Sequence, residues 1–393
     1  MSEKPFSRTW LTLACCSGYF VLGLVISLIG VSLERLAGHV SASVTAVGGT
    51  FFIYVGIASI ISLFATGPVI DRYGKKPVAV TGSLLTGASL LLICFTTSFG
   101  RACAAMFLMG LGTGCLNAGI NTLINDLYPK NPGRALNLGN AFFGLGAVFL
   151  PLLAGWLFLT MGLKHLLILT AVFTSIPSVL FYFSVFPPPV VGQRFRFSEA
   201  LRVFRDPLVG LIGLLLFFYV GLEASFGIWS RAAIADHWQL RPPFDQLTLA
   251  GFWTGLVLGR IFAATIFRTI DDEDLVLYCA VGSCAGVALF VLAPSALSAS
   301  AGLWFAGLCF GPIFPSCLAI TGQNCRSYPA TSLTVVIACG VLGMVVITPA
   351  IGWVAEASSL MKGLWLSLGA GLMMLTVQVV LRKKVKKRSI SNR

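Results

Sequence analysis

The chain has 393 residues and a formal net charge of +13, and 57% of its residues are hydrophobic while only 10% are charged. Soluble domains carry roughly 25% charged residues, so a water-soluble globule is excluded, and 30 phenylalanines exclude a disordered chain. A membrane-spanning helix needs about 20 apolar residues, and this chain has room for about twelve. We therefore expect a polytopic membrane protein.

Twelve apolar runs follow one another along the chain, and none shows the period-two alternation of a β-strand. Only helices and closed barrels satisfy their backbone polar groups in lipid, so these runs predict an all-α fold. The expected spans are 10–31, 44–66, 77–98, 102–124, 137–159, 164–186, 208–230, 247–267, 275–293, 297–320, 331–354 and 361–381.

The longest connection between spans runs over 187–207 and begins with three prolines. It separates six spans from six. We therefore predict an amino-terminal six-helix bundle over 1–186, a cytoplasmic linker over 187–207, a carboxy-terminal six-helix bundle over 208–381 and a basic tail over 382–393.

The two halves also repeat each other under a shift of 197 residues. A duplicated six-helix unit leaves such a shift, and alternating-access transporters are built from repeated halves. We therefore expect two pseudo-symmetric bundles with twelve transmembrane helices in all. The shift lays Gly110, Gly114, Gly146, Gly155 and Trp156 onto Gly307, Gly311, Gly343, Gly352 and Trp353.

Basic residues between the spans orient the chain in the bilayer. Twenty Lys and Arg lie on the side of the two termini and six on the other side. Cytoplasmic loops carry the excess of positive charge, so we expect both termini in the cytoplasm and a bacterial cytoplasmic membrane as the location. These charges indicate a lipid bilayer as partner and not a nucleic acid. The outer six are Arg35, Arg101, Lys164, Arg231, Arg241 and Lys362.

The loop after the second span reads Gly67-Pro-Val-Ile-Asp71-Arg72-Tyr-Gly74-Lys75-Lys76. Glycine permits a tight turn and close helix approach, and a carboxylate can accept hydrogen bonds from the amino terminus of a helix. The loop resembles the signature of the major facilitator superfamily; the alternative is an ordinary basic loop at the membrane surface. The resemblance implies a conformational role for Gly67, Asp71, Arg72, Gly74 and Lys75.

Four further segments resemble one branch of that superfamily, which includes fucose–proton symporters and sodium-dependent glucose transporter-like proteins. They are 110–121, 219–229, 253–260 and 311–315. The resemblance implies transport of a small polar solute such as a sugar, with a proton or a sodium ion as coupling ion. Asn117 stands where that branch often carries an acid, so the coupling ion, and coupling itself, stay open.

Two charged residues fall inside predicted spans, Glu223 and Arg260. A charge at bilayer depth costs about 2.5–3.5 kcal/mol on insertion scales and normally faces a cavity or a partner. Glu223 is the candidate for coupling and for binding substrate, and its alternative is a structural acid. Arg260 is a candidate for anion or sugar-hydroxyl contact, or a strut. Counted from the span ends, their levels differ by about 10 Å, so a direct pair requires kinks or long reach.

Asparagines share one face of the span 102–124. Asn117, Asn121 and Asn125 stand at i, i+4 and i+8, and their carboxamides suit a polyol or another neutral polar solute. The alternative is hydrogen bonding between helices. Asn140, early in the next span, shares both interpretations. Among the aromatic residues near these positions we place Tyr219 and Trp253 at the substrate, against an alternative of plain packing.

Pro151 and Pro349 follow a glycine by five or six residues in spans 137–159 and 331–354. Proline removes a helical hydrogen bond, so these residues are expected to bend their spans and to contribute to gating.

The leading functional hypothesis is a secondary transporter of a small polar solute, working by alternating access as a monomer. The alternatives are efflux of lipophilic or drug-like compounds and a receptor or assembly protein that does not transport. No GxxxxGK[ST], HExxH or GxSxG motif occurs, so we expect no enzyme activity. We also expect no metal site and no cofactor beyond a coupling H⁺ or Na⁺.

Overall fold

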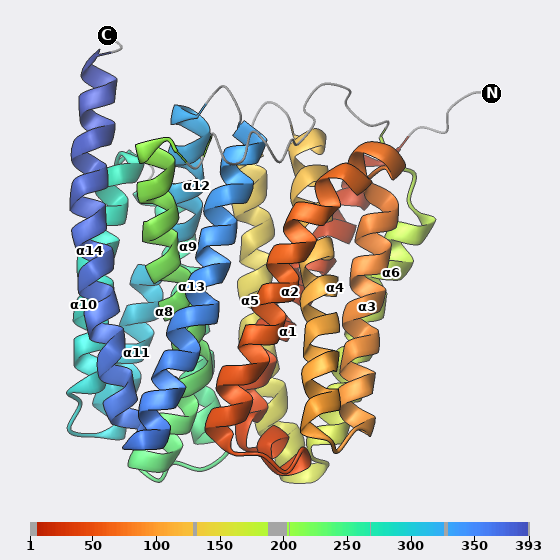
Figure 1. The fold of residues 1–393 in the computed structure, drawn as a ribbon, viewed down its shortest axis with the longest axis vertical. Coiled ribbons are helices and arrows are strands. Elements are labelled where there is room, and N and C mark those ends of the chain that lie inside the picture. Colours follow the sequence, from red (N-terminus) through yellow and green to blue (C-terminus); the bar gives the residue numbers. More distant parts are fainter. Residues whose placement is uncertain are drawn as a thin grey trace. The chain divides into compact units, whose positions relative to one another are not determined.

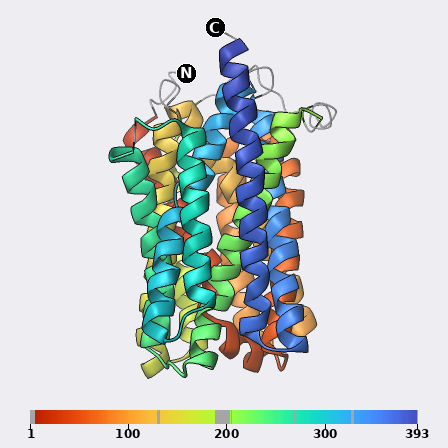
Figure 2. The ribbon, with the colours of Figure 1, turned by 90° about the vertical axis from the view of Figure 1, so that its left-hand side faces the viewer.

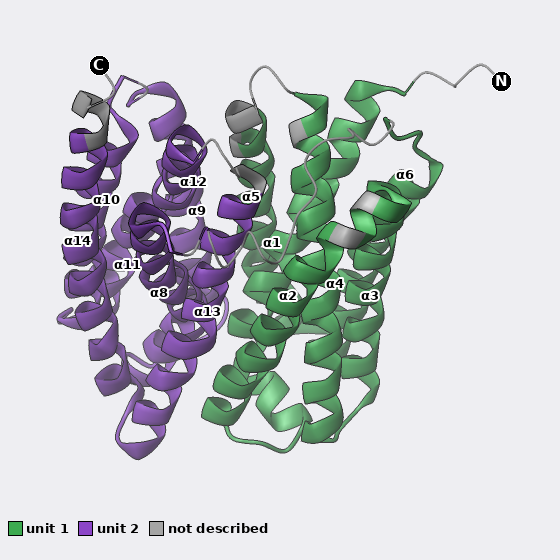
Figure 3. Ribbon diagram, turned by 45° about the horizontal axis from the view of Figure 1, so that its top comes forward, with its two compact units in different colours: residues 1–195 green, residues 196–393 purple. Residues whose placement is uncertain are grey.

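The computed structural model describes residues 6–128, 132–187, 203, 205–267, 269–325 and 329–391. The chain divides into two compact units, Met1–Phe195 and Arg196–Arg393, which are coloured separately in Figure 3. Most of the predicted linker 187–207 lies outside the described residues, so its structure stays a prediction.

Each unit is a bundle of long helices, seen from two sides in Figure 1 and Figure 2. The described part contains twelve helical segments that are long and apolar enough to cross a membrane, which confirms the predicted fold class. Unit 1 contains α1 (Arg8–His39), α2 (Val44–Tyr73), α3 (Lys75–Phe95), α4 (Phe99–Leu127), α5 (Pro132–Thr160) and α6 (Leu163–Phe183). Unit 2 contains α8 (Pro207–His237), α9 (Phe244–Thr265), α10 (Asp272–Val291), α11 (Ala296–Phe310), α12 (Ile313–Asn324), α13 (Pro329–Ala357) and α14 (Leu360–Ser391).

Helix starts follow the local sequence. Ser7 and Ser43 accept hydrogen bonds from backbone N–H groups in the first turns of α1 and α2. Asp206 does the same for α8, where Pro207 occupies the first helical position. These caps satisfy donors that have no partner within the helix. Ser295 and Ser298 form a reciprocal capping box at the start of α11.

The predicted span 297–320 is interrupted, because α11 ends at Phe310 and α12 begins at Ile313. The cause is two prolines, Pro312 and Pro315, which lack backbone N–H groups. In a continuous helix the N–H of residue 315 would bond to the carbonyl of Gly311, and proline leaves that carbonyl without its helical donor. Pro151 and Pro349 do not interrupt α5 and α13, so the bends expected there stay predictions.

The helix pairings of unit 1 recur in unit 2. In unit 1, α1 packs on α5, α2 on α4, and α3 on both α4 and α6. In unit 2, α8 packs on α13, α9 on α11, and α10 on both α11 and α14. Helices at the same place in each half therefore have the same neighbours.

Glycines mark the closest approaches at equivalent places in the two units. Gly146 of α5 faces the backbone carbonyl of Phe20, and Gly343 of α13 faces that of Phe217. The two glycines are 197 residues apart, and so are the two carbonyls. The shift of 197 therefore relates contacts between helices as well as residue types in the sequence. The same offset relates Gly110 and Val55 to Gly307 and Phe252, and Gly114 and Ser59 to Gly311 and Leu256.

We predict that Gly343→Ala strongly destabilises the protein, because its Cβ would overlap the carbonyl of Phe217. Overpacking of this kind costs typically about 1–3 kcal/mol. Gly369→Ala in α14 is the matched control, since nothing lies within 4 Å of a Cβ there. Thermal unfolding in detergent should show a lower Tm for Gly343→Ala only; an equal loss in both variants would contradict the packing argument.

Candidate functional site

The two ionisable residues predicted inside the spans form a pair in unit 2. Glu223 lies on α8 and Arg260 on α9, with 3.8 Å between Glu223 Oε1 and an Arg260 Nη2. Their side chains are 14% and 7% exposed, so both are largely removed from solvent. At 3.8 Å the contact is an ion pair without a hydrogen bond, because an N–H···O bond needs a donor–acceptor distance of about 2.7–3.2 Å.

The expected offset of about 10 Å between these charges is too large, and helix packing explains why. Trp253 of α9 packs its ring on Gly227 of α8, where a Cβ would come within 2.9 Å of Cζ2. From that level the antiparallel helices reach Arg260 after seven residues and Glu223 after four. The remaining three residues amount to about 4.5 Å, which the two side chains bridge.

Arg260 also holds the interruption between α11 and α12. Its Nε donates to the carbonyl oxygen of Gly311 at 3.2 Å, the carbonyl that Pro315 leaves without a helical donor. Arg260 is therefore a strut and also the partner of Glu223, and its contact with an anion or a sugar hydroxyl stays a prediction.

Three buried polar atoms around this pair lack a hydrogen bond of good geometry to any described residue. They are the hydroxyl of Tyr219, the indole Nε1 of Trp253 and Oε1 of Glu223. Tyr219 and Trp253 are fully buried, and Tyr219 lies one turn before Glu223, beside both charges. Unpaired buried polar atoms are costly, so this set is suited to accept a polar ligand or water. We call Tyr219, Glu223, Trp253 and Arg260 the unit 2 polar cluster.

Aromatic side chains surround one side of the cluster. The ring of Tyr219 lies 5.8 Å from that of Phe310 and 6.3 Å from that of Phe314, centroid to centroid. These two residues lie at either side of the helix interruption, at the end of α11 and the start of α12. The polar groups of the cluster are thus held in an apolar setting, where electrostatic interactions are stronger than in water.

Unit 1 contains a hydrogen-bonded chain of three side chains. The hydroxyl of Tyr19 donates to Asn121 Oδ1 at 2.7 Å, and Asn121 Nδ2 donates to Asn117 Oδ1 at 2.5 Å. Gly139 of α5 lies against the Tyr19 ring, so a larger residue there would displace the tyrosine. We call Tyr19, Asn121 and Asn117 the asparagine chain. Sequence spacing predicted that Asn117 and Asn121 share a face, but not that Tyr19 joins them.

The other predicted amides are accounted for in part. The side chain of Asn125 lies outside the described residues. Asn140 donates from Nδ2 to the carbonyl of Leu136 at 3.0 Å, one turn earlier on α5. Substrate roles for Asn140 and for the asparagine chain remain predictions.

The signature loop joins α2 to α3 at Gly74, which has φ of +82°, a conformation that glycine adopts without strain. Lys75, directly after it, forms an ion pair with Asp126 at the end of α4. Arg72 is exposed and lies over the ring of Tyr73. Gly67 lies within α2, and the side chain of Asp71 lies outside the described residues.

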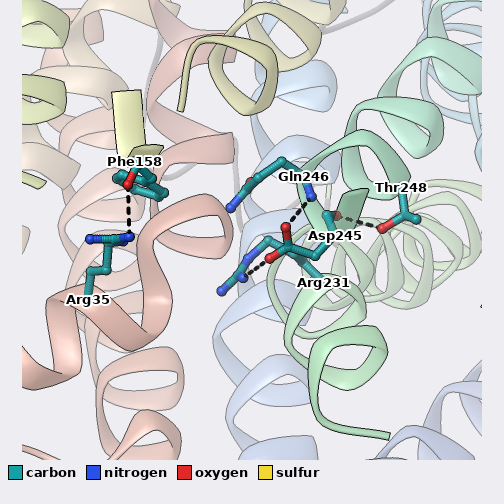
Figure 4. Close-up of polar contacts among 6 residues, drawn as sticks. All are labelled: Arg35, Phe158, Arg231, Asp245, Gln246 and Thr248. Carbon is teal, nitrogen blue, oxygen red and sulfur yellow. Dashed lines mark hydrogen bonds and ion pairs between the residues drawn. The ribbon is translucent and has the colours of Figure 1, made fainter. Parts of the chain in front are cut away.

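A buried ion pair near the other ends of α8 and α9 was missed from the sequence. Arg231, expected in an outer loop, lies within α8 and is 4% exposed. Figure 4 shows its Nη1 donating to Asp245 Oδ2 at 2.7 Å, with the Gln246 N–H on Asp245 Oδ1. The signal missed was the length of the helix, because α8 continues to His237 instead of ending near 230.

Figure 4 also draws Arg35, an exposed cation near the end of α1 in unit 1. Arg35 donates to the carbonyl of Phe158 at 3.4 Å and lies 4.2 Å above its ring. No group of three or more His, Cys, Asp or Glu side chains that could hold a metal ion occurs within the described ranges.

A sequence profile of the Major Facilitator Superfamily matches residues 15–348. The chain belongs to this superfamily and is a multi-pass membrane transporter of the secondary type, not an enzyme. The resemblance inferred from the signature loop is thereby confirmed.

Several known proteins are similar to the chain over most of its length. The glucose/mannose transporter GlcP of Bacillus subtilis is 21% identical over 353 residues, covering 85% of this chain and 84% of GlcP. The enterobactin exporter EntS of Escherichia coli is 26% identical over 297 residues, or 72% of this chain and 65% of EntS. The crystal structure of the Escherichia coli fucose:proton symporter FucP aligns with a TM-score of 0.70 at 17% identity, covering 95% and 98% of the two chains. At that identity the likeness shows the fold alone.

We predict that Glu223 and Arg260 are energetically coupled in the folded protein. Arg260→Met leaves the carboxylate buried without its partner, which costs about 3–5 kcal/mol. The double variant Glu223→Gln/Arg260→Met should lose less stability than the sum of the two single variants. Thermal unfolding of the four proteins measures the coupling; strict additivity would show that the 3.8 Å contact contributes nothing.

Proposed function

We propose that this transporter moves a small polar solute, such as a sugar or a related metabolite, and that the unit 2 polar cluster binds it. The observation that carries the proposal is a loose ion pair between Glu223 and Arg260, beside buried polar atoms of Tyr219 and Trp253 that lack hydrogen-bond partners of good geometry. A solute hydroxyl can donate to Glu223 and accept from Trp253 or Arg260. The aromatic surroundings suit the apolar face of a sugar ring.

The asparagine chain offers matching chemistry in unit 1. Asn117 uses its side-chain oxygen to accept from Asn121, while no described residue accepts from its own NH₂ group. Two N–H donors thus remain on a carboxamide whose orientation is held by Asn121 and Tyr19. We infer that Asn117 and Asn121 bind solute hydroxyls, with Asn140 as a further contact.

We further propose that Glu223 is the coupling group and that the coupling ion is a proton. A proton on Glu223 neutralises the carboxylate and weakens its attraction to Arg260, whereas a sodium ion at the same oxygen would lie beside the arginine and be repelled. Binding or release of this proton changes the charge of the cluster at the place where the solute binds. Proton binding and solute binding are thereby linked.

The conformational cycle we infer is alternating access by a monomer in a bacterial cytoplasmic membrane, with both termini in the cytoplasm. Burial of Arg231 removes one cation from the outer loops and leaves the charge bias unchanged in direction. The Lys75–Asp126 pair ties the signature loop to α4 and is the proposed conformational contact, together with Gly67, Asp71, Arg72 and Gly74. Pro151 and Pro349 are the proposed bending points.

Export is the second candidate, and the similarity to an enterobactin exporter favours it. An exporter of larger, partly apolar compounds would use the aromatic residues around Tyr219 more than the amides. A polar-solute transporter and an exporter of this kind would bind different classes of ligand. A receptor without transport activity would differ from both, because it would move no solute across the membrane.

We predict that a sugar or polyol raises the Tm of the purified protein, because a ligand that binds only the folded state stabilises it. The panel should hold sugars, polyols, nucleosides and lipophilic amines, each at two pH values. Glu223→Gln and Asn117→Ala should each reduce the shift, while Glu356→Gln at the exposed end of α13 should retain it. Shifts from amines alone would favour export, and silence across the panel would contradict a polar-solute site.

We predict that Glu223→Gln separates binding from coupling. With the panel ligand enclosed in proteoliposomes at a concentration that saturates the weaker site, exchange of labelled for unlabelled solute should persist, since the amide keeps a hydrogen-bonding side chain in place. Uphill uptake driven by a pH gradient should fall to the level of empty vesicles. Uphill uptake at the wild-type rate would overturn the assignment of Glu223 as the proton carrier.

A further inference from the structure

The carboxy-terminal end of α14 carries five cations within six residues, 382–387. The helix does not end where the apolar span ends but continues through Ser391. About 20 helical residues cross the hydrocarbon core, so a span that starts at Leu360 is complete near residue 380. The cations therefore lie about half a turn to two turns beyond it, at the level of lipid headgroups.

One face of this extension is held by unit 2 itself. Gln378 donates from Nε2 to the carbonyl of Glu273 at 2.6 Å. One and two turns later, Arg382 and Lys386 both donate to the carboxylate of Asp274. The three α14 residues are spaced at i, i+4 and i+8, so a single stripe of the helix is fastened to the first turn of α10.

These contacts with α10 fix the rotation of α14 and so determine which of its cations face away from the bundle. Val385 is 7% exposed and turns toward the bundle, while Lys383, Lys384 and Lys387 are exposed. At 100° per residue these three lysines occupy one sector of about 100°, away from the Asp274 stripe. No described acidic side chain pairs with any of them.

The fold leaves this sector open. α14 extends past the ends of the neighbouring helices of unit 2, as Figure 2 shows for the dark blue helix beside α8 and α10. Three ammonium groups on a helix held at fixed rotation, just outside the hydrocarbon, form a cationic surface that faces the headgroup layer. Anionic headgroups are attracted to such juxtamembrane lysines.

We propose that Lys383, Lys384 and Lys387 bind the phosphate groups of anionic phospholipids, while Arg382 and Lys386 serve a separate, structural purpose through Asp274. The basic run thus contains two sets of residues on different faces of one helix, one that binds lipid and one that packs α14 on α10. The lipid contact orders the exposed sector and adds to the stability of the α10–α14 packing.

The test compares the Tm of the full-length protein in nanodiscs of pure phosphatidylcholine with that in nanodiscs containing phosphatidylglycerol. The wild type should be more stable by a few degrees in the anionic discs, and high salt should remove this increment. Lys383→Gln/Lys384→Gln/Lys387→Gln should keep the wild-type Tm in neutral discs and lose the increment. The matched control Arg382→Gln/Lys386→Gln should lose Tm in both discs and keep the increment.

Two results would overturn the proposal. One is an undiminished phosphatidylglycerol increment in the triple variant, which would place the lipid site elsewhere. The other is an equal loss of Tm by the triple variant in both kinds of disc, which would make the lysines structural. Inorganic phosphate added to neutral discs should not reproduce the increment; if it does, the ligand is a free anion and not a lipid.

Discussion

A backbone carbonyl or a charge without a partner costs several kcal/mol in hydrocarbon, and this cost organises the centre of unit 2. Pro315 deprives the Gly311 carbonyl of its helical donor, and the Nε of Arg260 supplies a replacement. The same guanidinium then needs an acid, and Glu223 lies 3.8 Å from it. The helix interruption, Arg260 and Glu223 therefore depend on one another: the arginine satisfies the free carbonyl, and the glutamate balances the arginine. Tyr219 and Trp253 lie beside this pair, and their buried polar atoms have no hydrogen-bond partner of good geometry within the described part of the fold.

Close approach between helices is the second constraint, and the two units meet it in the same way. Gly146 and Gly343 bring α5 and α13 against the backbones of α1 and α8 at positions related by the shift of 197. The polar groups on the repeated framework differ. Unit 1 has a neutral chain through Asn117 and Asn121, and unit 2 has an ion pair. Duplication thus explains the scaffold, and divergence of a few side chains explains the chemistry.

Hydropathy was enough to predict twelve membrane-spanning helices, because membrane burial imposes a length and a composition on each helix. Contacts between helices were harder to predict from the sequence. The Glu223–Arg260 pair depends on the register that Trp253 and Gly227 set between α8 and α9, and no spacing within one helix reveals it. Arg231 was misplaced because hydropathy ends a span at the first charge, although a charge paired with Asp245 can stay inside. Tyr19 could not be linked to Asn121 without knowing that α1 lies beside α4.

The charges on α8 and α9 have a consequence for how the protein is made. α8 carries Glu223 and Arg231, α9 carries Asp245 in its first turn and Arg260 further along, and each of these four charges finds its opposite on the other helix of the hairpin. Entering the bilayer singly, either helix would expose two uncompensated charges to lipid; entering as a hairpin, the pair exposes none. Insertion during synthesis should therefore wait at this point in the chain until both segments have emerged, which makes α8 and α9 a single unit of membrane integration.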